Sequence, residues 1–178
     1  GGGFPGLPLA ILHPQTSFLL VDSVNKKLTA IDDMISSLQL TNVQTLHTRV
    51  EEMATQSPTK HRHQYGVVLG RSVTSIPRFC FWTKELLVRK TGRMVYITGG
   101  DLEDFVEERC FLTVPISGEG EEEKRALVIN QVNVDWIAGK SGEKSRKVGK
   151  EGSKKKRIGG KSSGGSSGSG RSEKIKGK

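Results

Sequence analysis

The sequence lacks the residue patterns that mark several protein classes. Among its 178 residues are only two cysteines, Cys80 and Cys110, which form neither a C-x-x-C pair nor a zinc-type spacing. Two distant cysteines exclude a disulfide scaffold, and we expect reduced thiols in an intracellular compartment. No run of about 18 apolar residues occurs, which excludes a membrane-spanning helix. No signal peptide is recognisable either.

Acidic residues are scarce in one part of the chain, and this gives the sequence its positive charge. The whole chain has a formal net charge of +9, yet residues 139–178 contain 14 Lys and Arg against only 3 Asp and Glu. The other 138 residues are therefore nearly neutral, at −2. In the basic segment 34 of 40 residues are Gly, Ser, Lys or Arg and none is aromatic. Such a segment cannot bury a core, so we expect a folded domain over 1–138 and a disordered basic tail over 139–178.

Apolar runs of strand length alternate with segments of helical periodicity in the first 108 residues. Strands are expected at 18–21, 43–47, 65–69 and 94–97, helices at 7–12, 26–40, 76–88 and 101–108, and a loop at 53–64. Two antiparallel strands are expected at 110–115 and 126–131. The continuous apolar run 18–21 predicts a strand buried on both faces. This order predicts an α/β fold with a mostly parallel, doubly wound sheet and an antiparallel C-terminal strand.

The first six residues, GGGFPG, fit the pattern G-x-G-x-x-G. Glycines in such a turn let the backbone approach a nucleotide closely. Asp22 follows Gly3 by 19 residues, at the end of a predicted strand, where a carboxylate can accept hydrogen bonds from both ribose hydroxyls. The alternative is a tight turn with Asp22 as the N-cap of the following helix. The pattern alone does not distinguish a nicotinamide cofactor from S-adenosylmethionine. A glycine loop normally follows a strand, so we expect the chain to start within an element order already under way.

Two sequence blocks carry a family resemblance: G-G-G-F-P-G-L-P-L at the start and L-V-D-S-V-N-K-K from Leu20. T-R-V-E-E over 48–52 and G-R-S-V over 70–73 lie at two further family motifs. On these residues the chain resembles the RsmG family (glucose-inhibited division protein B, GidB) of small-subunit rRNA guanine-N7 methyltransferases. The resemblance covers about residues 1–131.

The resemblance implies a class I, Rossmann-like methyltransferase fold that binds S-adenosyl-L-methionine and methylates N7 of a guanine in small-subunit rRNA. By position in the family motifs, the residues implied to border the cofactor are Gly1, Gly3, Phe4, Asp22, Val50, Glu51 and Arg71. Asp22 would hold the ribose, and Val50 with Glu51 would flank the adenine. Arg71 would lie at the cofactor or substrate mouth. Arg71 and Arg49 could contact phosphate or the cofactor carboxylate. For Arg49, an ordinary solvated or salt-bridged arginine is an equally good explanation.

The sequence departs from the family pattern at three places. The family has a strand ending in Asp-Val-Gly before the glycine loop, preceded by helices, and the sequence given does not contain them. Without that central strand, its two neighbours would be left with unpaired edges. Tyr65-Gly66 stands where the family has Phe-Asp, and Thr98-Gly99 stands where the family has Lys-Gly. The last change removes a cation near the transfer site, which favours a diverged enzyme or one with weak or lost activity.

Other polar and aromatic features receive simpler interpretations. His61 and His63 flank Arg62 in a polar segment without further ligands, so a family insertion loop is favoured over a metal site. Trp136 is expected to pack on the core. The tail residues Lys154, Lys155, Lys156 and Arg157 are expected to neutralise rRNA phosphates. A solubilising, targeting or nuclear-localisation role fits the same tail residues.

Three functions follow, in decreasing order of support. The first is an S-adenosylmethionine-dependent rRNA guanine-N7 methyltransferase, expected to be a monomer without a membrane partner, in the cytoplasm or an organelle such as the chloroplast. The second is a catalytically weak or inactive RNA-binding relative. The third is a nicotinamide-dependent oxidoreductase, supported only by the glycine pattern with Asp22, since no Tyr-x-x-x-Lys pair supplies a catalytic acid.

Overall fold

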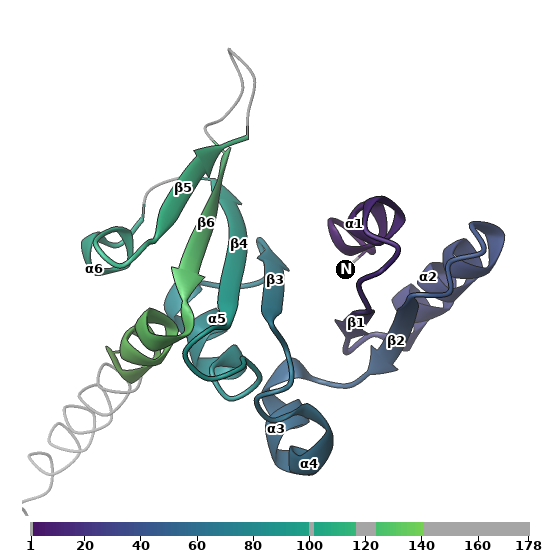
Figure 1. Ribbon diagram of the computed structural model, residues 1–178, viewed down its shortest axis with the longest axis horizontal. Coiled ribbons are helices and arrows are strands. Elements are labelled where there is room, and N and C mark those ends of the chain that lie inside the picture. Colours follow the sequence, from purple (N-terminus) through teal and green to yellow (C-terminus); the bar gives the residue numbers. More distant parts are fainter. Residues whose placement is uncertain (1, 100–101, 117–123, 141–178) are drawn as a thin grey trace, which may run out of the picture. The chain divides into compact units, whose positions relative to one another are not determined.

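A computed structural model describes residues 2–99, 102–116 and 124–140 of the chain (Figure 1). The acidic turn at 119–123 and the basic tail from 141 onward lie outside these residues. The elements, in chain order, are α1 Gly6–Leu12, β1 Phe18–Asp22, α2 Asn25–Ser37, β2 Val43–His47, α3 Val50–Gln56, α4 Pro58–His61, β3 Val67–Arg71, α5 Ile76–Thr83, β4 Arg93–Gly99, α6 Asp104–Glu107, β5 Leu112–Pro115 and β6 Lys124–Asn130. Residues 131–140 are helical as well.

The predicted alternation of strands and helices is confirmed, and two local predictions in this part of the chain are wrong. The segment 53–64, predicted as a loop, contains the end of α3 and the short helix α4. Val50, Met53 and Ala54 lie at helical spacing on the face that packs inward, and Pro58 occupies the first turn of α4. The helix predicted over 76–88 ends at Thr83.

Two segments that directly follow a helix or a strand differ from the prediction: the residues after α5 and the residues after β6. After α5, the chain extends beside Tyr65, whose N–H donates to Leu86 O and whose carbonyl accepts from the Val88 N–H. Backbone pairing with Tyr65 therefore replaces the helical hydrogen bonds of the expected longer helix. The helix over 131–140 was not predicted at all.

The strands form two sheets instead of the single predicted sheet. Strands β1 and β2 are parallel, and the second sheet has the order β3-β4-β6-β5, with β3 and β4 parallel and β6 antiparallel to both of its neighbours. Within the described residues, β1 is paired only with β2 and β3 only with β4. Both strands therefore have an unpaired edge, as predicted for a sheet without its central strand.

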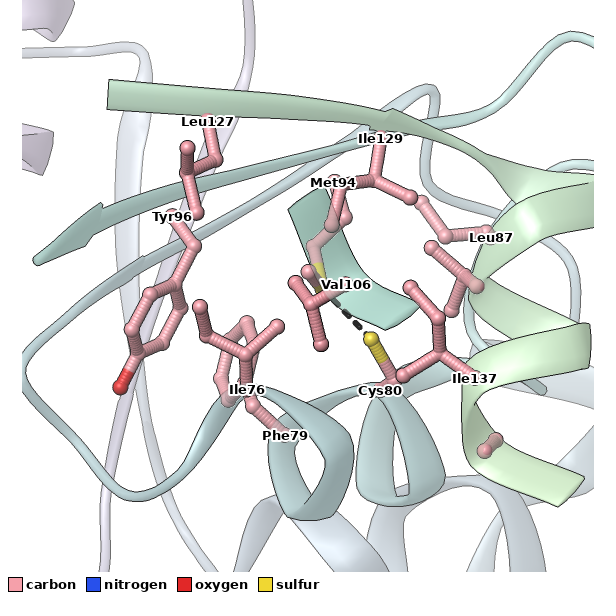
Figure 2. Packing of buried hydrophobic residues seen from close by; sticks show 12 residues of the cluster. Ile76, Phe79, Cys80, Leu87, Met94, Tyr96, Val106, Leu127, Ile129 and Ile137 are labelled. Carbon is pink, nitrogen blue, oxygen red and sulfur yellow. Dashed lines mark hydrogen bonds between the residues drawn. The ribbon is translucent and has the colours of Figure 1, made fainter. Parts of the chain in front are cut away.

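The larger core belongs to the second sheet (Figure 2). Met94 and Tyr96 of β4 and Leu127 and Ile129 of β6 are at most 1% exposed. They pack against Phe79 and Cys80 of α5 and against Val134 and Ile137 of the helix over 131–140, and Trp136 lies partly buried against the same cluster. The Cys80 thiol donates a hydrogen bond to Met94 Sδ at 3.7 Å, and burial raises its pKa to about 12. The expected core role of Trp136 is confirmed.

The first sheet has a smaller core made with α1 and α2. Its fully buried members are Leu7, Ala10, Leu28, Ile31 and Val43. Every residue of β1 is half-buried, so the prediction of a strand buried on both faces is wrong. The physical reason is that β1 is an edge strand of a two-stranded sheet.

Candidate functional site

The carboxyl ends of the first two strands are tied together by backbone and side-chain hydrogen bonds. Asp22 and His47 are the last residues of β1 and β2 and lie opposite each other in the parallel register. The Thr48 N–H donates to Asp22 O at 3.2 Å, and His47 Nε2 lies 3.1 Å from Ser23 O. The turns that leave the two strands are therefore fixed relative to each other. In open α/β sheets this edge is where ligands bind.

The Asp22 carboxylate organises the turn before α2 without capping that helix. Its side chain is 9% exposed. Oδ1 accepts the Val24 N–H at 2.8 Å, and Oδ2 lies 3.4 Å from Lys27 Nζ. The N-cap of α2 is Val24, with no side-chain capping bond, so the alternative role of Asp22 as the helix cap is wrong. An ionised carboxylate acts only as a hydrogen-bond acceptor, which is the role that the hydroxyls of a sugar require at this strand end.

The glycine motif forms a tight turn that leads into α1. Gly1 lies outside the described residues. Gly3 has a φ of +83°, and a Cβ there would lie 2.6 Å from Leu7 Cδ1, so both the backbone and the packing require glycine. The Leu7 N–H donates to Gly3 O at 2.7 Å, and the Phe4 side chain is 60% exposed. The motif therefore places exposed backbone and an exposed ring beside the start of α1.

Val50 and Glu51 begin α3, directly after the turn that follows β2. The Val50 side chain is partly buried and packs against Met53 and Ala54, so one of its faces belongs to the core. Glu51 Oε1 lies 3.9 Å from Arg49 Nη1, and the Arg49 side chain is 64% exposed. This supports the interpretation of Arg49 as an exposed, salt-bridged arginine.

The second sheet presents a separate set of residues at its own parallel-strand end. Arg71 is the last residue of β3 and pairs in register with Ile97. Its side chain is exposed, and no ion pair joins it to any residue that the structure describes. Thr98 Oγ1 donates to Gly99 O at 3.2 Å. At the position where the family pattern has a lysine, β4 therefore offers a hydroxyl and no charge.

Tyr96 was not predicted as a functional residue, although the sequence contains a signal for it. Tyr96 lies opposite Gly70 in the register of β3 and β4, and a glycine inside an apolar strand often marks a close approach. The buried Tyr96 hydroxyl contacts the backbone of Val73 and Thr74, in the loop that follows Arg71. The structure thus ties this loop to β4.

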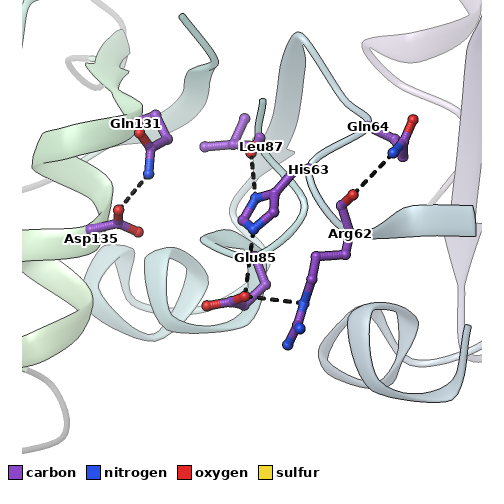
Figure 3. A network of polar contacts seen from close by, with 7 residues as sticks. All are labelled: Arg62, His63, Gln64, Glu85, Leu87, Gln131 and Asp135. Carbon is purple, nitrogen blue, oxygen red and sulfur yellow. Dashed lines mark hydrogen bonds and ion pairs between the residues drawn. The ribbon is translucent and has the colours of Figure 1, made fainter. Parts of the chain in front are cut away.

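The two histidines of the H-R-H segment have structural partners, and Figure 3 shows those of His63 and of Arg62 between them. His61 is 5% exposed and shares a 2.7 Å hydrogen bond with the Tyr65 hydroxyl, and burial lowers the pKa of His61. His63 Nδ1 lies 3.0 Å from Leu87 O, and Arg62 Nε lies 3.2 Å from Glu85 Oε2. These contacts join the end of α4 to the segment after α5. Among the described residues, no three His, Cys, Asp or Glu side chains come together as a metal site.

None of the helices in the described ranges has the length and apolar character needed to cross a membrane. The tail residues Lys154, Lys155, Lys156 and Arg157 lie outside these ranges, so their contact with RNA stays a prediction.

Comparison of the sequence with known families gives a match over residues 1–117 to GidB, described as rRNA small subunit methyltransferase G. The chain is 41% identical over 108 residues to the ribosomal RNA small subunit methyltransferase G of Chlorobium chlorochromatii, covering 61% of this chain and 43% of that protein. It is 39% identical over 114 residues to the protein of the same name from Christiangramia forsetii, covering 61% of this chain and 50% of the relative. The chain thus spans about half the length of these curated relatives.

Comparison of the fold gives more distant likenesses. The chain is similar to the S-adenosylmethionine-dependent methyltransferase SibL, with a TM-score of 0.54 at 13% identity over 73% of this chain and 48% of that one. It is also similar to the CMeT domain of the citrinin polyketide synthase, with a TM-score of 0.54 at 9% identity over 72% of this chain and 44% of that one. These likenesses show the Rossmann-like fold of class I methyltransferases.

Proposed function

The chain belongs to the GidB family, rRNA small subunit methyltransferase G, and from this membership we propose that the protein methylates small-subunit rRNA at N7 of a guanine. The observation that carries the proposal is Asp22, a nearly buried carboxylate at the carboxyl end of a parallel strand whose Leu20 packs at Gly6 of the glycine motif. Fold and family both support methyl transfer, while the oxidoreductase alternative rests only on the glycine pattern with Asp22.

The residues present fit S-adenosyl-L-methionine as the cofactor. Asp22 would accept hydrogen bonds from the ribose hydroxyls, and the Gly3 turn has the positive φ that a close backbone approach requires. Val50 would offer an apolar surface to the adenine, and Glu51 at the start of α3 would lie beside it. Phe4, whose ring is exposed, would border the same ligand. When bound, the cofactor supplies an electrophilic methyl group on a sulfonium.

The chain's own residues would then bind and orient the cofactor and the guanine, and none of them has to remove a proton. Guanine N7 already carries a lone pair, so its attack on the methyl group needs no general base. Holding two reactants in line can supply up to about 7–11 kcal/mol of barrier reduction. Arg71, exposed at the end of β3, is suited to contact an RNA phosphate or the cofactor carboxylate. Positioning by these residues is sufficient for the reaction class.

One feature favours a weakly active or inactive relative as the second candidate. Thr98 supplies no charge where the family pattern has a lysine. Within the described residues, β1 and β3 each have one unpaired edge. We propose that a strand outside the described residues pairs with both edges in the active protein, as the family resemblance implies.

The remaining parts of the proposal concern partners and location. The tail cations Lys154, Lys155, Lys156 and Arg157 would tether the enzyme to rRNA phosphates, with an affinity that falls steeply as salt rises. The protein would act as a monomer, without a membrane partner, in the cytoplasm or in an organelle such as the chloroplast.

The test uses two proteins. One is this chain, and the other is an extended chimera in which Gly1 is preceded by the segment that precedes the matched region in the Chlorobium chlorochromatii relative. Each is incubated with radiolabelled S-adenosylmethionine and unmethylated small ribosomal subunits. The proposal expects label in the rRNA of the chimera reaction and chain cleavage at 7-methylguanosine after reduction and aniline treatment. Binding of S-adenosylhomocysteine without labelled rRNA would establish the inactive relative.

A further inference from the structure

Tyr96 makes an unusual set of contacts for a core residue. Its side chain is 1% exposed, and its ring packs on Phe79 with ring centroids 5.0 Å apart. The hydroxyl, however, does not reach solvent. It accepts the Val73 N–H at 2.9 Å and the Thr74 N–H at 3.0 Å, and it donates to Thr74 O through a short hydrogen bond. One buried oxygen therefore satisfies three backbone groups of a two-residue stretch.

The strand opposite is shaped to admit this ring. Gly70 lies across from Tyr96 in the β3–β4 register. A Cβ at Gly70 would lie 2.7 Å from Tyr96 Cδ2 and 2.7 Å from Phe79 Cζ. Any side chain at Gly70 would therefore displace the tyrosine, and with it the hydrogen bonds of its hydroxyl. The contact is built by residues of three elements, β3, β4 and α5.

The loop held in this way connects β3 to α5. A second bond fixes its start, because the Ser72 N–H donates to Ile97 O at 3.1 Å and Ser72 has a φ of +47°. The backbone of this loop is therefore hydrogen-bonded to β4, while its side chains are exposed to solvent. Val73 is 56% exposed, and Arg71 and Ser72 are exposed as well. A rigid loop thus presents an apolar side chain next to an arginine at the carboxyl end of β3.

We propose that Tyr96 is a positioning residue for methyl transfer. Its hydroxyl fixes the loop over residues 72–74 so that Val73 forms the apolar surface against which the acceptor base rests. This inference rests on the proposed function, since it names the part of the site that receives the RNA. Small displacements of a positioned reactant are costly to rate, so the loop needs a tether that does not itself touch the ligand. A buried hydroxyl with three backbone partners meets that requirement.

The first test measures the tether without measuring activity. Hydrogen exchange of the Val73 and Thr74 amides is compared between the wild-type chain, Tyr96→Phe and Tyr65→Phe. Tyr65→Phe is the matched control, because it also removes one hydroxyl, from a tyrosine whose partner is His61. Each lost hydrogen bond is expected to speed exchange about five-fold. Faster exchange in Tyr96→Phe alone supports the tether, whereas equal exchange in all three proteins overturns it.

The second test separates positioning from stability in the extended chimera. Tyr96→Phe should lower kcat for rRNA methylation about ten-fold or more, while S-adenosylhomocysteine affinity stays within about two-fold of wild type. Tyr65→Phe should change neither quantity. If Tyr96→Phe transfers methyl groups as fast as wild type, the positioning role is overturned and the proposed function stands. If the wild-type chimera transfers no methyl group, the proposed function fails and the positioning role fails with it.

The base-contacting residue is tested by variants that leave the fold intact. Val73 is exposed, so Val73→Asp should fold normally even where Tyr96→Phe does not. A carboxylate against the base should raise KM for the ribosomal subunit about ten-fold, and Val73→Leu should keep it near wild type. An unchanged KM in Val73→Asp would overturn the role of this loop as the platform for the base.

Discussion

The two sheets of this chain contain different kinds of information. The β1–β2 pair contains the start of one of the two family sequence blocks, from Leu20 to Asp22, yet no residue of β1 is fully buried. The β3-β4-β6-β5 sheet contains few recognisable motifs, yet Met94, Leu127 and Ile129 are 0% exposed. The residues expected to bind the cofactor therefore lie on the less buried sheet. The residues expected to stabilise the fold most lie on the sheet with few family motifs. The difference teaches that recognition of a family and prediction of a stable core draw on different residues.

The difference between the two sheets predicts that the largest loss of stability follows a substitution in the core of the second sheet. Leu127→Ala removes a fully buried side chain and should lower the free energy of unfolding by about 2–5 kcal/mol. Leu20→Ala in half-buried β1 should cost about 1 kcal/mol, because less apolar area is lost and water can reach the site. Urea unfolding followed by the fluorescence of Trp82 and Trp136 measures the first loss, and calorimetry measures both. Equal losses would contradict the contrast between the sheets.

The next effect concerns the ligand edge of the first sheet. Asp22→Asn keeps an oxygen for the Val24 N–H but removes the charge that the proposal places against a sugar hydroxyl. Charge-assisted hydrogen bonds contribute about 1.5–3 kcal/mol, so S-adenosylhomocysteine affinity should fall about ten-fold or more. The matched control is Asp33→Asn on the exposed side of α2. Similar affinity in the two variants would remove Asp22 from the site.

A smaller effect is expected where the first sheet meets α1. Asn42 Nδ2 lies 3.1 Å from Ala10 O, 3.2 Å from His13 O and 3.0 Å from Thr16 O, so this amide satisfies carbonyls at the end of α1. Asn42→Asp replaces the donor by an acceptor and should cost about 1–3 kcal/mol, seen as faster amide exchange in α1. The same change at Asn25, in the first turn of α2, should be neutral or slightly stabilising. Unchanged amide exchange in α1 would show that the Asn42 hydrogen bonds do not stabilise the end of this helix.

The smallest effect is expected at Arg49. Its guanidinium pairs with Glu51 at 3.9 Å on the surface, and such pairs contribute about 0–1 kcal/mol. Arg49→Ala should therefore leave both the free energy of unfolding and S-adenosylhomocysteine affinity near wild type. A clear loss of affinity, measured beside Asp22→Asn, would instead make Arg49 a ligand contact.

Much of the first sheet follows from local sequence. The run F-L-L-V, the helical spacing of Leu28, Ile31 and Met34, and the turn at Asn42 predict β1, α2 and β2 within a few residues. The unpaired edges of the sheets were also predictable, since a family strand is missing from the sequence given. Asp22 as the strand-end carboxylate was predicted from spacing, and the structure places it there.

The errors have physical causes that local patterns do not reveal. The helix α5 ends at Thr83 because Tyr65 offers backbone partners to the residues that follow. The helix over 131–140 was missed because Val134, Ile137 and Ala138 are buried only after β6 brings them to the sheet. Tyr96 was missed because its partners, the Val73 and Thr74 amides, lie more than twenty residues away in sequence. Such contacts depend on strand register, which the pattern of one strand does not contain.

The central claim is that the edge marked by Asp22 binds the cofactor of a methyltransferase. Its most direct test is calorimetric titration of this chain and of the extended chimera with S-adenosylhomocysteine, with NAD as the control ligand. We predict that S-adenosylhomocysteine binds the chimera, that Asp22→Asn weakens the binding about ten-fold or more, and that NAD does not bind. Failure of both proteins to bind S-adenosylhomocysteine, or equal binding of NAD, would contradict the claim.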